Sequence, residues 1–392
     1  MRIVLTTESY LPYLSGVTIS VEGLARGLGA RGHEVLVVAP KPADGAQRVE
    51  TGASGPEPRV AWLESYQLPR VAPPMYRMPW PNPWSDALRA ATAFDPDVVH
   101  AHSPFVTGLF ALRLARGTNA ALVFTHHTRF ADYGHYLGPL ARLGGIGVQA
   151  YLARFWRACA AVIVPSGDMA ADVRDRGGAE RIEVIPTGVD VAAIRATAAV
   201  DPRPRAGWPA EAVVIASLGR LAPEKSPMVV LEAIAAAPGT FLVVIGGGPL
   251  EPDLRRRAER PDLAGRVMFT GVLPRPEAFG RLRGADLFAF ASRTETQGLV
   301  LAEALAAGLP AVALAGPGVA DSLRDGVDGV IVAAEPEPTR GARLGAELAR
   351  LVEDAAARER MATNARSGAE RFDIGRRIGE VESLYRSLRP ER

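Results

Sequence analysis

Two glutamates with a fixed spacing, Glu295 and Glu303, are the side chains most indicative of chemistry, and they lie in the segment 292–308, SRTETQGLVLAEALAAG. The preceding run 286–291, DLFAFA, has the aromatic content of a strand, and the residues that follow have helix propensity and almost no polar face. A helix that begins at Gly298 offers unpaired N–H groups and the positive end of its dipole, and the absent side chain lets an anion approach closely. The segment therefore predicts a phosphate site.

Glu303 shares a face of this expected helix with Leu299, so its carboxylate could hold a ribose diol next to a phosphate bound at the N-terminus. Its neighbours are apolar, and a carboxylate among them is costly unless it has a partner. Two alternatives remain open: Thr294 and Gln297 could form a capping box beside an ordinary Glu295, and Glu303 could pair with an arginine. Glycoside hydrolysis by the pair is disfavoured, because eight helical residues separate the carboxylates by roughly 12 Å, beyond the ~5 to 9 Å that this reaction needs.

Composition limits the classes of protein to which the chain can belong. With 392 residues, of which 48% are hydrophobic, it has the size and apolar content of two ordinary domains. The net charge of +2, without a basic run, argues against a nucleic-acid partner. The single cysteine, Cys159, predicts a small core residue. No apolar run approaches the ~18 residues of a membrane span, so we expect a cytoplasmic protein.

The first half of the chain opens with a β–α–β pattern. Strands are expected at 2–6 and 34–40 around a helix at 17–31, and the loop between the first strand and the helix contains Gly16. Ligands of open α/β folds bind at such a strand-to-helix loop, although a turn glycine ahead of a helix would look the same. Further strands are expected at 161–166 and 182–186.

Histidines end two further expected strands, DVVHAH at 97–102 and LVFTHHT at 122–128. Histidines at strand ends resemble zinc ligands, but no Cys, Asp or Glu spacing supports a metal site. Core or capping histidines are the alternative for His100, His102 and His126.

Aromatic and arginine side chains are concentrated in two segments of this half. Segment 68–84, LPRVAPPMYRMPWPNPW, cannot be a regular helix or a central strand. It suits an acceptor lip or a membrane-facing edge, or a loop whose aromatic residues anchor it to the core. A helix within 137–160, with Tyr151, Trp156 and Arg157, could lie on a bilayer, but amphipathic helices more often bury the apolar face in their own domain.

The second half repeats the strand-and-helix pattern. Its first expected strand, 212–218, ends at Gly219 and is followed by Arg220 and Lys225, one of only two lysines in an arginine-rich chain. Further strands are expected at 241–248, 266–273 and 310–314, and the tail 341–388 is mostly helical in composition. The triple glycine after the second of these strands does not complete the G-x-G-x-x-G fingerprint of a nicotinamide oxidoreductase.

The motifs of both halves are similar to those of a known enzyme family. Glu295 and Glu303 match the E-x7-E motif of family 4 retaining glycosyltransferases, Arg220 and Lys225 match its G-R-x4-K motif, and PTGVD at 186–190 resembles its hinge. The resemblance implies the α/β GT-B fold, with two Rossmann-like, doubly wound domains that face a cleft. It places an acceptor-binding domain at 1–189 and a nucleotide-sugar-binding domain at 190–373, with helix 374–388 packing back on the first.

The resemblance also implies a role for each matching residue. In the family the first glutamate contacts the donor sugar, the second the ribose, and the backbone between them the diphosphate, which an arginine and a lysine also clamp. Carried over, these roles give catalytic residues His127, Arg220, Lys225 and Glu295, and donor-binding residues Ser15, Gly16, Arg220, Lys225, Val272, Glu295, Gly298, Leu299, Val300 and Glu303. The aromatic stretch 129–136 adds Tyr133 and Tyr136 as acceptor contacts.

Four positions depart from the family pattern. Gln297 stands where the family commonly has phenylalanine, Ser15 replaces the first glycine of a Gly-Gly pair, His126 replaces the aromatic of a T-aromatic-H-T pattern, and Thr187 replaces the hinge asparagine. Gln297 leaves the role of the backbone intact but makes the identity of the sugar an open question.

The segment TETQGLVLAEALAAGLP is similar in sequence to the corresponding segment of family members that glycosylate membrane lipids. The expected activity is therefore transfer of a hexose from a nucleotide sugar such as UDP-glucose to a lipid such as diacylglycerol with retention, by a protein that contacts the inner face of the cell membrane peripherally. A GDP-mannose-dependent mannosyltransferase acting on a phospholipid or soluble acceptor is the alternative, and a non-catalytic nucleotide-sugar binder is a more remote one. No visible motif calls for a cofactor or a metal ion.

Overall fold

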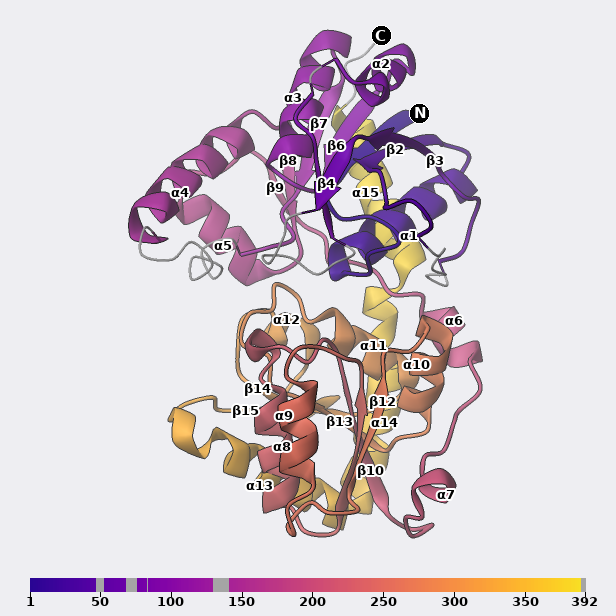
Figure 1. The fold of residues 1–392 in the computed structure, drawn as a ribbon, viewed down its shortest axis with the longest axis vertical. Helices are drawn as coiled ribbons and strands as arrows, with labels where there is room; N and C mark the ends of the chain where they lie inside the picture. Colours follow the sequence, from indigo (N-terminus) through magenta and orange to yellow (C-terminus); the bar gives the residue numbers. More distant parts are fainter. Residues whose placement is uncertain (47–52, 68–75, 83, 130–140, 389–392) are drawn as a thin grey trace. The chain divides into compact units, whose positions relative to one another are not determined.

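The computed structural model describes residues 1–46, 53–67, 76–82, 84–129 and 141–388. The chain divides into two compact units. Unit 1 contains Met1–Gly188 together with Ile374–Arg392, and unit 2 contains Val189–Asp373 (Figure 1).

Unit 1 is built on a seven-stranded sheet whose order is β3-β2-β1-β6-β7-β8-β9, with every neighbouring pair parallel. Its strands are β1 Arg2–Thr6, β2 Glu34–Pro40, β3 Arg59–Leu63, β6 Val98–Ala101, β7 Ala121–Thr125, β8 Ala161–Val164 and β9 Ile182–Val184. Its helices are α1 Gly16–Ala30, α2 Asp86–Ala93, α3 Val106–Thr118, α4 Ala141–Arg157, α5 Gly167–Asp175 and α15 Ile374–Leu388. Strands β4 Ser65–Gln67 and β5 Arg77–Pro79 form a separate antiparallel pair.

Unit 2 is built on a six-stranded parallel sheet with the order β12-β11-β10-β13-β14-β15. Its strands are β10 Val213–Leu218, β11 Thr240–Ile245, β12 Val267–Gly271, β13 Leu287–Phe290, β14 Ala311–Leu314 and β15 Gly329–Val332. Its α-helices are α6 Val191–Ala196, α7 Arg203–Ala206, α8 Pro227–Ala236, α9 Glu251–Ala258, α10 Arg275–Arg283, α11 Leu299–Ala307, α12 Val319–Ser322, α13 Arg340–Glu353 and α14 Ala355–Gly368. Short 3₁₀ turns occur at η2 Pro223–Lys225, η3 Glu337–Thr339 and η4 Ala369–Phe372.

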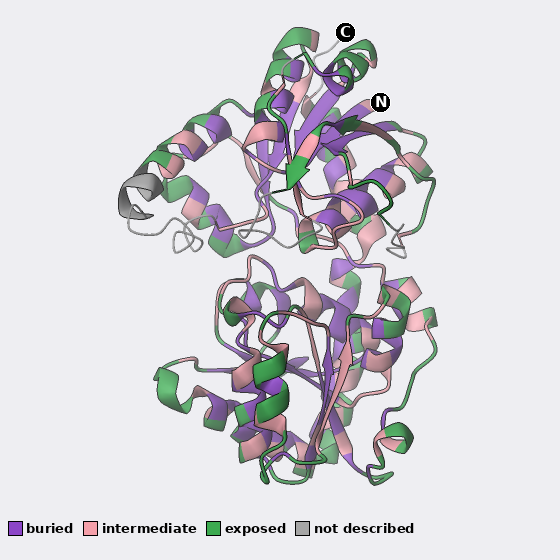
Figure 2. Cartoon of the chain, viewed as in Figure 1, coloured by how far each residue is buried: buried purple, intermediate pink, exposed green. Residues whose placement is uncertain are grey.

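The core of each unit lies on both faces of its sheet. The central strands are continuous apolar runs, as expected of parallel strands covered by helices on both sides, and most of their residues are buried (Figure 2). Two hydrophobic clusters flank each sheet, and in unit 1 one of them is closed by residues of α15 such as Ile378 and Tyr385.

Helix α15 packs directly against α1, although the two are more than 340 residues apart in the sequence. Glycine makes this approach possible, because a Cβ built on Gly27 would lie 2.0 Å from Cδ1 of Ile378. The predicted helix at 374–388 has the bounds of α15, and its apolar face belongs to unit 1.

Strand order reverses once in each sheet, between β1 and β6 in unit 1 and between β10 and β13 in unit 2. In open α/β sheets ligands bind outside the carboxyl ends of the strands at such a switch point, where the connecting loops diverge to opposite faces. The two switch points therefore locate the parts of each unit best placed to hold a ligand.

Two strands of the parallel sheets were not predicted from the sequence. Strands β3 and β15 were not among the expected strands, because the first is short and irregular in pattern and the second lies in a glycine-rich turn region. Within the described parts of the chain, no helix is both long and apolar enough to cross a membrane.

Candidate active site

The loops that follow β10 and β13 lie side by side at the switch point of unit 2. The backbone N–H of Arg293 donates to the carbonyl of Glu224 at 3.1 Å, and the Ser292 hydroxyl donates to the same oxygen at 3.4 Å. The same contact region joins two side chains predicted from separate motifs, because the Lys225 ammonium forms an ion pair with the Glu295 carboxylate. The fold thus brings a cation and a carboxylate together across 70 residues of sequence.

Arg220, the other predicted cation, lies in the loop after β10 and forms an ion pair with Glu224. Burial acts to raise the pKa of the Glu224 carboxyl, but hydrogen bonds and the charge of Arg220 outweigh it, so the net shift is downward. Arg220 itself is exposed. An exposed guanidinium in a surface ion pair can turn towards an anion at little energetic cost.

Helix α11 begins where the sequence predicted. Its N-cap is Gly298, with the left-handed angles φ 77° and ψ 55°, and no side chain caps the helix. The N–H groups of Leu299 and Val300 have no acceptor within the helix, and the positive end of the dipole lies at the same place. The capping-box alternative is therefore wrong: Gln297 precedes the N-cap, and its carbonyl instead accepts a hydrogen bond from the Ser322 hydroxyl.

Glu303 lies in the second turn of α11, and its carboxylate has the partner that its burial demands. Its side chain is only 2% exposed and accepts a hydrogen bond from the Arg275 guanidinium at 2.6 Å. Arg275 is the first residue of α10, and its guanidinium lies 4.8 Å from the centroid of the Phe279 ring. The alternative that Glu303 pairs with an arginine is confirmed, and a ribose contact would have to share the carboxylate with Arg275.

Two further loops line the same sheet edge. Val272 follows β12 with 76% of its surface exposed, which is unusual for valine, and a Cβ on the adjacent Gly247 would lie 2.9 Å from the Val272 side chain. In the turn after β14, a Cβ on Gly318 would lie 2.8 Å from the backbone nitrogen of Gln297. Glycine thus allows both turns to pack closely against the loops that carry predicted site residues.

In unit 1 the predicted donor residues Ser15 and Gly16 form the start of α1. Ser15 is the N-cap: its hydroxyl accepts from the Thr18 N–H at 3.1 Å and lies 2.7 Å from the Ser9 hydroxyl. The serine that departs from the family pattern therefore has a structural use. A Cβ on Gly16 would meet no atom within 4 Å, so the packing of the protein itself does not require glycine there.

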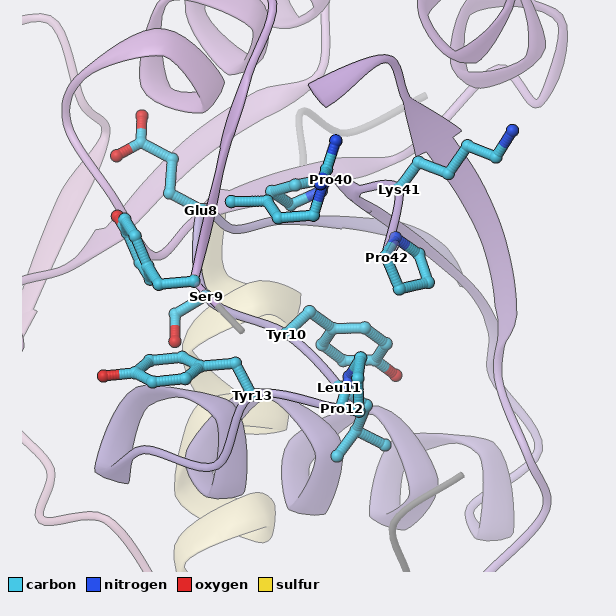
Figure 3. Close-up of a pocket in the computed structure, with 11 residues that line it drawn as sticks. Glu8, Ser9, Tyr10, Leu11, Pro12, Tyr13, Pro40, Lys41 and Pro42 are labelled. Carbon is cyan, nitrogen blue, oxygen red and sulfur yellow. The ribbon is translucent and has the colours of Figure 1, made fainter. Parts of the chain in front are cut away.

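A pocket beside β1 contains a carboxyl group that the sequence reasoning did not single out. Glu8 follows β1, is buried, and accepts a hydrogen bond from the Thr107 N–H at 3.2 Å. Burial raises the pKa of the Glu8 carboxyl, although this bond and others lower it in part. Figure 3 shows that Glu8 and Lys41 extend away from one another, while Tyr10 and Tyr13 line the pocket between α1 and the sheet.

Three of the four predicted strand-end histidines, His100, His102 and His127, form one cluster at the carboxyl ends of β6 and β7, and His126 packs instead against Phe124 and Trp156. His102 Nδ1 lies 2.9 Å from His127 Nε2, and the rings of His100 and His102 are 4.2 Å apart. His100 contacts the Tyr385 hydroxyl at 2.5 Å and the Thr125 hydroxyl at 2.7 Å. His100 is thus a core histidine, whereas His102 directly contacts the predicted catalytic residue.

Burial keeps these imidazoles neutral. It lowers the pKa of His100 and of His126 to about 3 and that of His127 to about 4, and it moves the pKa of His102 in the same direction. Among the residues that the structure describes, no three His, Cys, Asp or Glu side chains are grouped so that they could hold a metal ion.

The acceptor residues predicted from the resemblance cannot be placed. The described residues do not include Tyr133 and Tyr136. They also exclude residues 68–75 and 83 of the segment 68–84, which is rich in proline and aromatic residues. The rest of that segment is informative: Trp80 and Trp84 are 57% and 71% exposed, which excludes anchoring to the core for these two. Tyr66 of β4 is edge-on to Trp80, with ring centroids 5.4 Å apart.

Helix α4 buries its apolar side in its own domain, which confirms the favoured alternative and excludes contact of Trp156 with a bilayer. Trp156 is fully buried in the hydrophobic core of unit 1, where its ring packs edge-on against His126. Cys159, at the end of the same helix, is buried as predicted, and burial raises the pKa of its thiol to about 12.

Sequence reasoning missed three residues that lie next to predicted site residues or line a pocket, one in unit 2 and two in unit 1. Arg275 has a recognisable position, since it opens the helix after a strand that ends at the ligand edge, but its partner is 28 residues away. Glu8 directly follows a buried strand, which is a usable signal. His102 was treated as a core histidine, and only the fold shows that it contacts His127.

Comparisons with known proteins match both halves of the chain to glycosyltransferases. A family model described as Glycosyltransferase Family 4 matches residues 14–193, and one described as Glycosyl transferases group 1 matches residues 201–368. An alpha-monoglucosyldiacylglycerol synthase of Streptococcus pneumoniae is 30% identical over 89% of this chain and 79% of its own length. A GDP-mannose-dependent alpha-mannosyltransferase of Mycobacterium tuberculosis is 30% identical over 80% of this chain and 79% of its own.

Solved structures show the same fold. A sucrose-phosphate synthase from Thermosynechococcus elongatus has a TM-score of 0.79 at 20% identity, covering 99% of this chain and 98% of that one. HepE of Anabaena, solved with UDP and glucose, has a TM-score of 0.73 at 20% identity and covers 99% of this chain and 100% of its own. Together with the two parallel sheets, these similarities confirm the predicted GT-B fold.

Proposed function

The chain belongs to glycosyltransferase family 4, and on this premise we propose that it transfers a glucosyl group from UDP-glucose to a membrane lipid such as diacylglycerol, with retention of configuration. Retaining hexosyl transfer from a nucleotide sugar follows from the family. The identity of the base, the sugar and the acceptor are our proposal. Unit 2 would bind the nucleotide sugar and unit 1 the acceptor.

The observation that carries the proposal is the meeting of Lys225, Glu295 and the N-terminus of α11 at the switch point of unit 2. A nucleoside diphosphate needs cations and N–H donors, and a sugar needs an acceptor for its hydroxyl hydrogens. A lysine, a glycine-capped helix start and a carboxylate supply these three functions within connected loops.

The chemistry follows from the charge that develops on the leaving group. The bond between the anomeric carbon and the diphosphate oxygen breaks, the acceptor hydroxyl oxygen bonds to the same carbon, and the hydroxyl proton leaves with the diphosphate. Lys225, Arg220 and the N–H groups at Leu299 and Val300 would stabilise the departing diphosphate, which is the group that gains negative charge.

The remaining predicted residues are assigned the roles that the family resemblance implies. We assign Glu295 to the sugar hydroxyls, Glu303 to the ribose, the backbone at Val272 to the base and His127 to the reaction centre. Gly16 fits an approach of phosphate to the start of α1, because the protein itself leaves the space next to its Cα open. Since Arg220 and Lys225 can neutralise the diphosphate, the proposal includes no metal ion.

The lipid acceptor is supported by the relatives named for glucosyldiacylglycerol synthesis and by the exposed aromatic residues of unit 1. Trp80 and Trp84 are large and exposed, the Arg89 guanidinium donates to the backbone carbonyl of Trp84, and amphipathic aromatic rings favour the headgroup region of a bilayer. With a net charge of +2, attachment should be weak and reversible, since each basic residue near an anionic surface contributes only about 1 kcal/mol. We therefore place the protein peripherally on the cytoplasmic face of a membrane.

A second candidate is GDP-mannose-dependent mannosyl transfer to a phospholipid or soluble acceptor. It is favoured by one specific observation, the 30% identity to a protein named for that activity over 80% of this chain. Gln297 keeps this possibility open, because the residue before the glycine differs from the common family pattern on the sugar side of the helix.

The test is a donor-by-acceptor matrix. Purified protein is mixed with UDP-glucose, UDP-galactose or GDP-mannose and with anionic vesicles that do or do not contain diacylglycerol, or with a soluble sugar or alcohol as acceptor, in the presence and absence of EDTA. Release of nucleoside diphosphate and labelled lipid are both measured, and the anomeric configuration of the product is read by NMR. Lipid labelled only from UDP-glucose supports the proposal, whereas transfer only from GDP-mannose or only to soluble acceptors refutes it.

A further inference from the structure

The contact between His102 and His127 has a consequence for the proton on each ring. His102 directly follows β6, His127 follows β7, and the distance from His102 Nδ1 to His127 Nε2 is 2.9 Å, with the rings nearly parallel at 20°. A hydrogen bond between two neutral imidazoles needs one protonated and one unprotonated nitrogen. The tautomer of one ring therefore dictates the tautomer of the other.

The second nitrogen of His102 indicates which ring donates. His102 is 4% exposed, and its Nε2 has no hydrogen-bond partner among the described residues. An unpaired N–H donor is rarer in protein interiors than an unpaired acceptor. The less costly arrangement leaves Nε2 as the bare acceptor and places the proton on Nδ1, from which His102 donates to His127 Nε2.

The surroundings keep this pair neutral and fixed. His100 stacks on His102 at 4.2 Å between centroids, and both nitrogens of His100 are bonded, one to Tyr385 of α15 and the other to Thr125 of β7. Burial lowers the pKa of His127 to about 4 and also lowers the pKa of His102, whose protonation the neighbouring His100 further disfavours. Near neutral pH the pair therefore has no net charge, and each ring carries one N–H.

We propose that His102 is a positioning residue that holds His127 as its Nδ1–H tautomer, so that His127 presents an N–H donor to the reacting groups. This proposal rests on the proposed function, because it takes His127 as the histidine of the reaction centre. An N–H donor complements a sugar hydroxyl oxygen or an oxygen of the departing diphosphate, whereas the opposite tautomer would direct a lone pair at the same oxygen. Selection of the tautomer by a neighbouring side chain is how buried partners generally orient catalytic imidazoles.

Three substitutions at one position separate positioning from packing. In His102→Asn the amide nitrogen can occupy the place of Nδ1 and donate to His127, in His102→Gln the amide reaches the place of Nε2 instead, and in His102→Leu no donor remains. We expect turnover to fall about 10- to 100-fold in the Leu and Gln variants, the range typical for loss of an orienting partner, and to recover largely in the Asn variant. The dissociation constant for UDP should be unchanged in all three.

His126→Phe is the matched control. His126 is buried next to the same cluster and packs edge-on against Trp156, and an aromatic ring retains that contact. This variant should keep both turnover and the His127 tautomer. Thermal melting of every variant shows whether unit 1 is folded, because a loss of activity due to packing alone would follow the melting temperature and not the Asn/Gln distinction.

The tautomer is measured independently of activity by NMR. The full-length protein with ¹⁵N-labelled histidine contains six imidazoles, and His127→Asn and His102→Asn identify the two pairs of signals by their absence. Long-range proton–nitrogen correlations should show His127 protonated on Nδ1 and bare on Nε2, and the pattern should change in His102→Leu.

The outcomes are decisive in both arms. A His127 ring protonated on Nε2 overturns the inference, and so does equal activity of the Asn and Gln variants at equal melting temperature. If the wild-type protein transfers no sugar from any donor in the matrix above, the proposed function fails, while the NMR arm still decides the tautomer.

Discussion

Replacing Arg275 with methionine should expose the dependence of unit 2 on one buried ion pair. Methionine keeps an apolar stem of similar length that can still contact Phe279, but it removes the guanidinium that lies 2.6 Å from Glu303. The Glu303 side chain, 2% exposed, would then hold a charge among the apolar residues of α11 without its ion-pair partner.

The magnitude follows from the burial of the pair. Removing one member of a buried ion pair typically costs about 3–5 kcal/mol, because the other charge is left without a partner. For a unit of this size 1 kcal/mol moves the melting temperature by about 2–4 °C, so the transition of unit 2 should fall by about 6–20 °C. Glu303→Gln should cost less, because the amide can still accept a hydrogen bond and Arg275, with a 17% exposed side chain, can reach water.

The assay is differential scanning calorimetry of wild type, Arg275→Met, Glu303→Gln and the double variant, each with and without UDP. The double variant should melt well above Arg275→Met, because it no longer buries an unpaired charge. Saturating UDP at 100 times its dissociation constant stabilises a binding-competent unit by about 2.7 kcal/mol, and this increment should shrink in Glu303→Gln if the carboxylate also holds the ribose. Melting of Arg275→Met within 2 °C of wild type would refute the ion-pair argument, and an unchanged UDP increment in Glu303→Gln would refute the ribose contact.

Three further predictions concern the charged site, the aromatic surface and the histidines. Lys225→Ala and Arg220→Ala should each reduce turnover by about 100-fold or more. Each should lower the free energy of unfolding by about 1 kcal/mol or less, since partly exposed ion pairs add little stability. Near-normal turnover in both variants would exclude the diphosphate role. The variant Trp80→Ala/Trp84→Ala should sediment less with anionic vesicles at low salt and label less lipid while it binds UDP normally, and Leu109→Ala, another exposed apolar residue of unit 1, is the control; equal sedimentation would exclude this surface. Unit 1 should lose stability as the pH falls below about 6.5 towards 4, because His100, His126 and His127 have folded-state pKa values below that of an unfolded histidine. Their contribution to the free energy of unfolding is fully present above about pH 6.5 and is lost on acidification. His126→Phe should flatten this pH dependence in calorimetry, and an unchanged slope would contradict the prediction.

The sequence was sufficient for features that depend on local pattern. The start of α11 at Gly298, the last helix at 374–388 and the strands that end at the ligand edge were all predicted, because apolar period, glycine position and helix propensity are local properties. The capping-box alternative was wrong because a short range of sequence fits either a capped helix or a glycine-capped one, and only the left-handed angle at Gly298 distinguishes them.

The partners of the site residues could not be predicted in the same way. Lys225 with Glu295 and His102 with His127 are joined across 70 and 25 residues, because the strands before them are neighbours in the sheet order. Arg275 and Glu303 are joined across 28 residues, because α10 packs against α11. The same limitation is why the sequence left two alternatives for the helix that carries Trp156. An amphipathic helix carries no mark in its sequence of whether its apolar face meets a bilayer or a sheet, and in α4 it meets the sheet.

The charged groups of unit 2 differ in how readily they can change partners. Lys225 forms an ion pair with Glu295, Arg220 forms one with Glu224, and both pairs are partly exposed. The charges of each pair compensate one another without a ligand, and separating them costs about 1 kcal/mol or less. A diphosphate offers two cations a more highly charged partner, and the carboxylate that Lys225 releases becomes available to sugar hydroxyls at the same moment. Glu303 and Arg275 are buried and cannot separate so cheaply. Donor binding should therefore rearrange the first two pairs and leave the third in place. On the proposed assignment, Glu303 would be a fixed contact for the ribose, and Lys225 with Glu295 would be the part of the site that responds to the substrate.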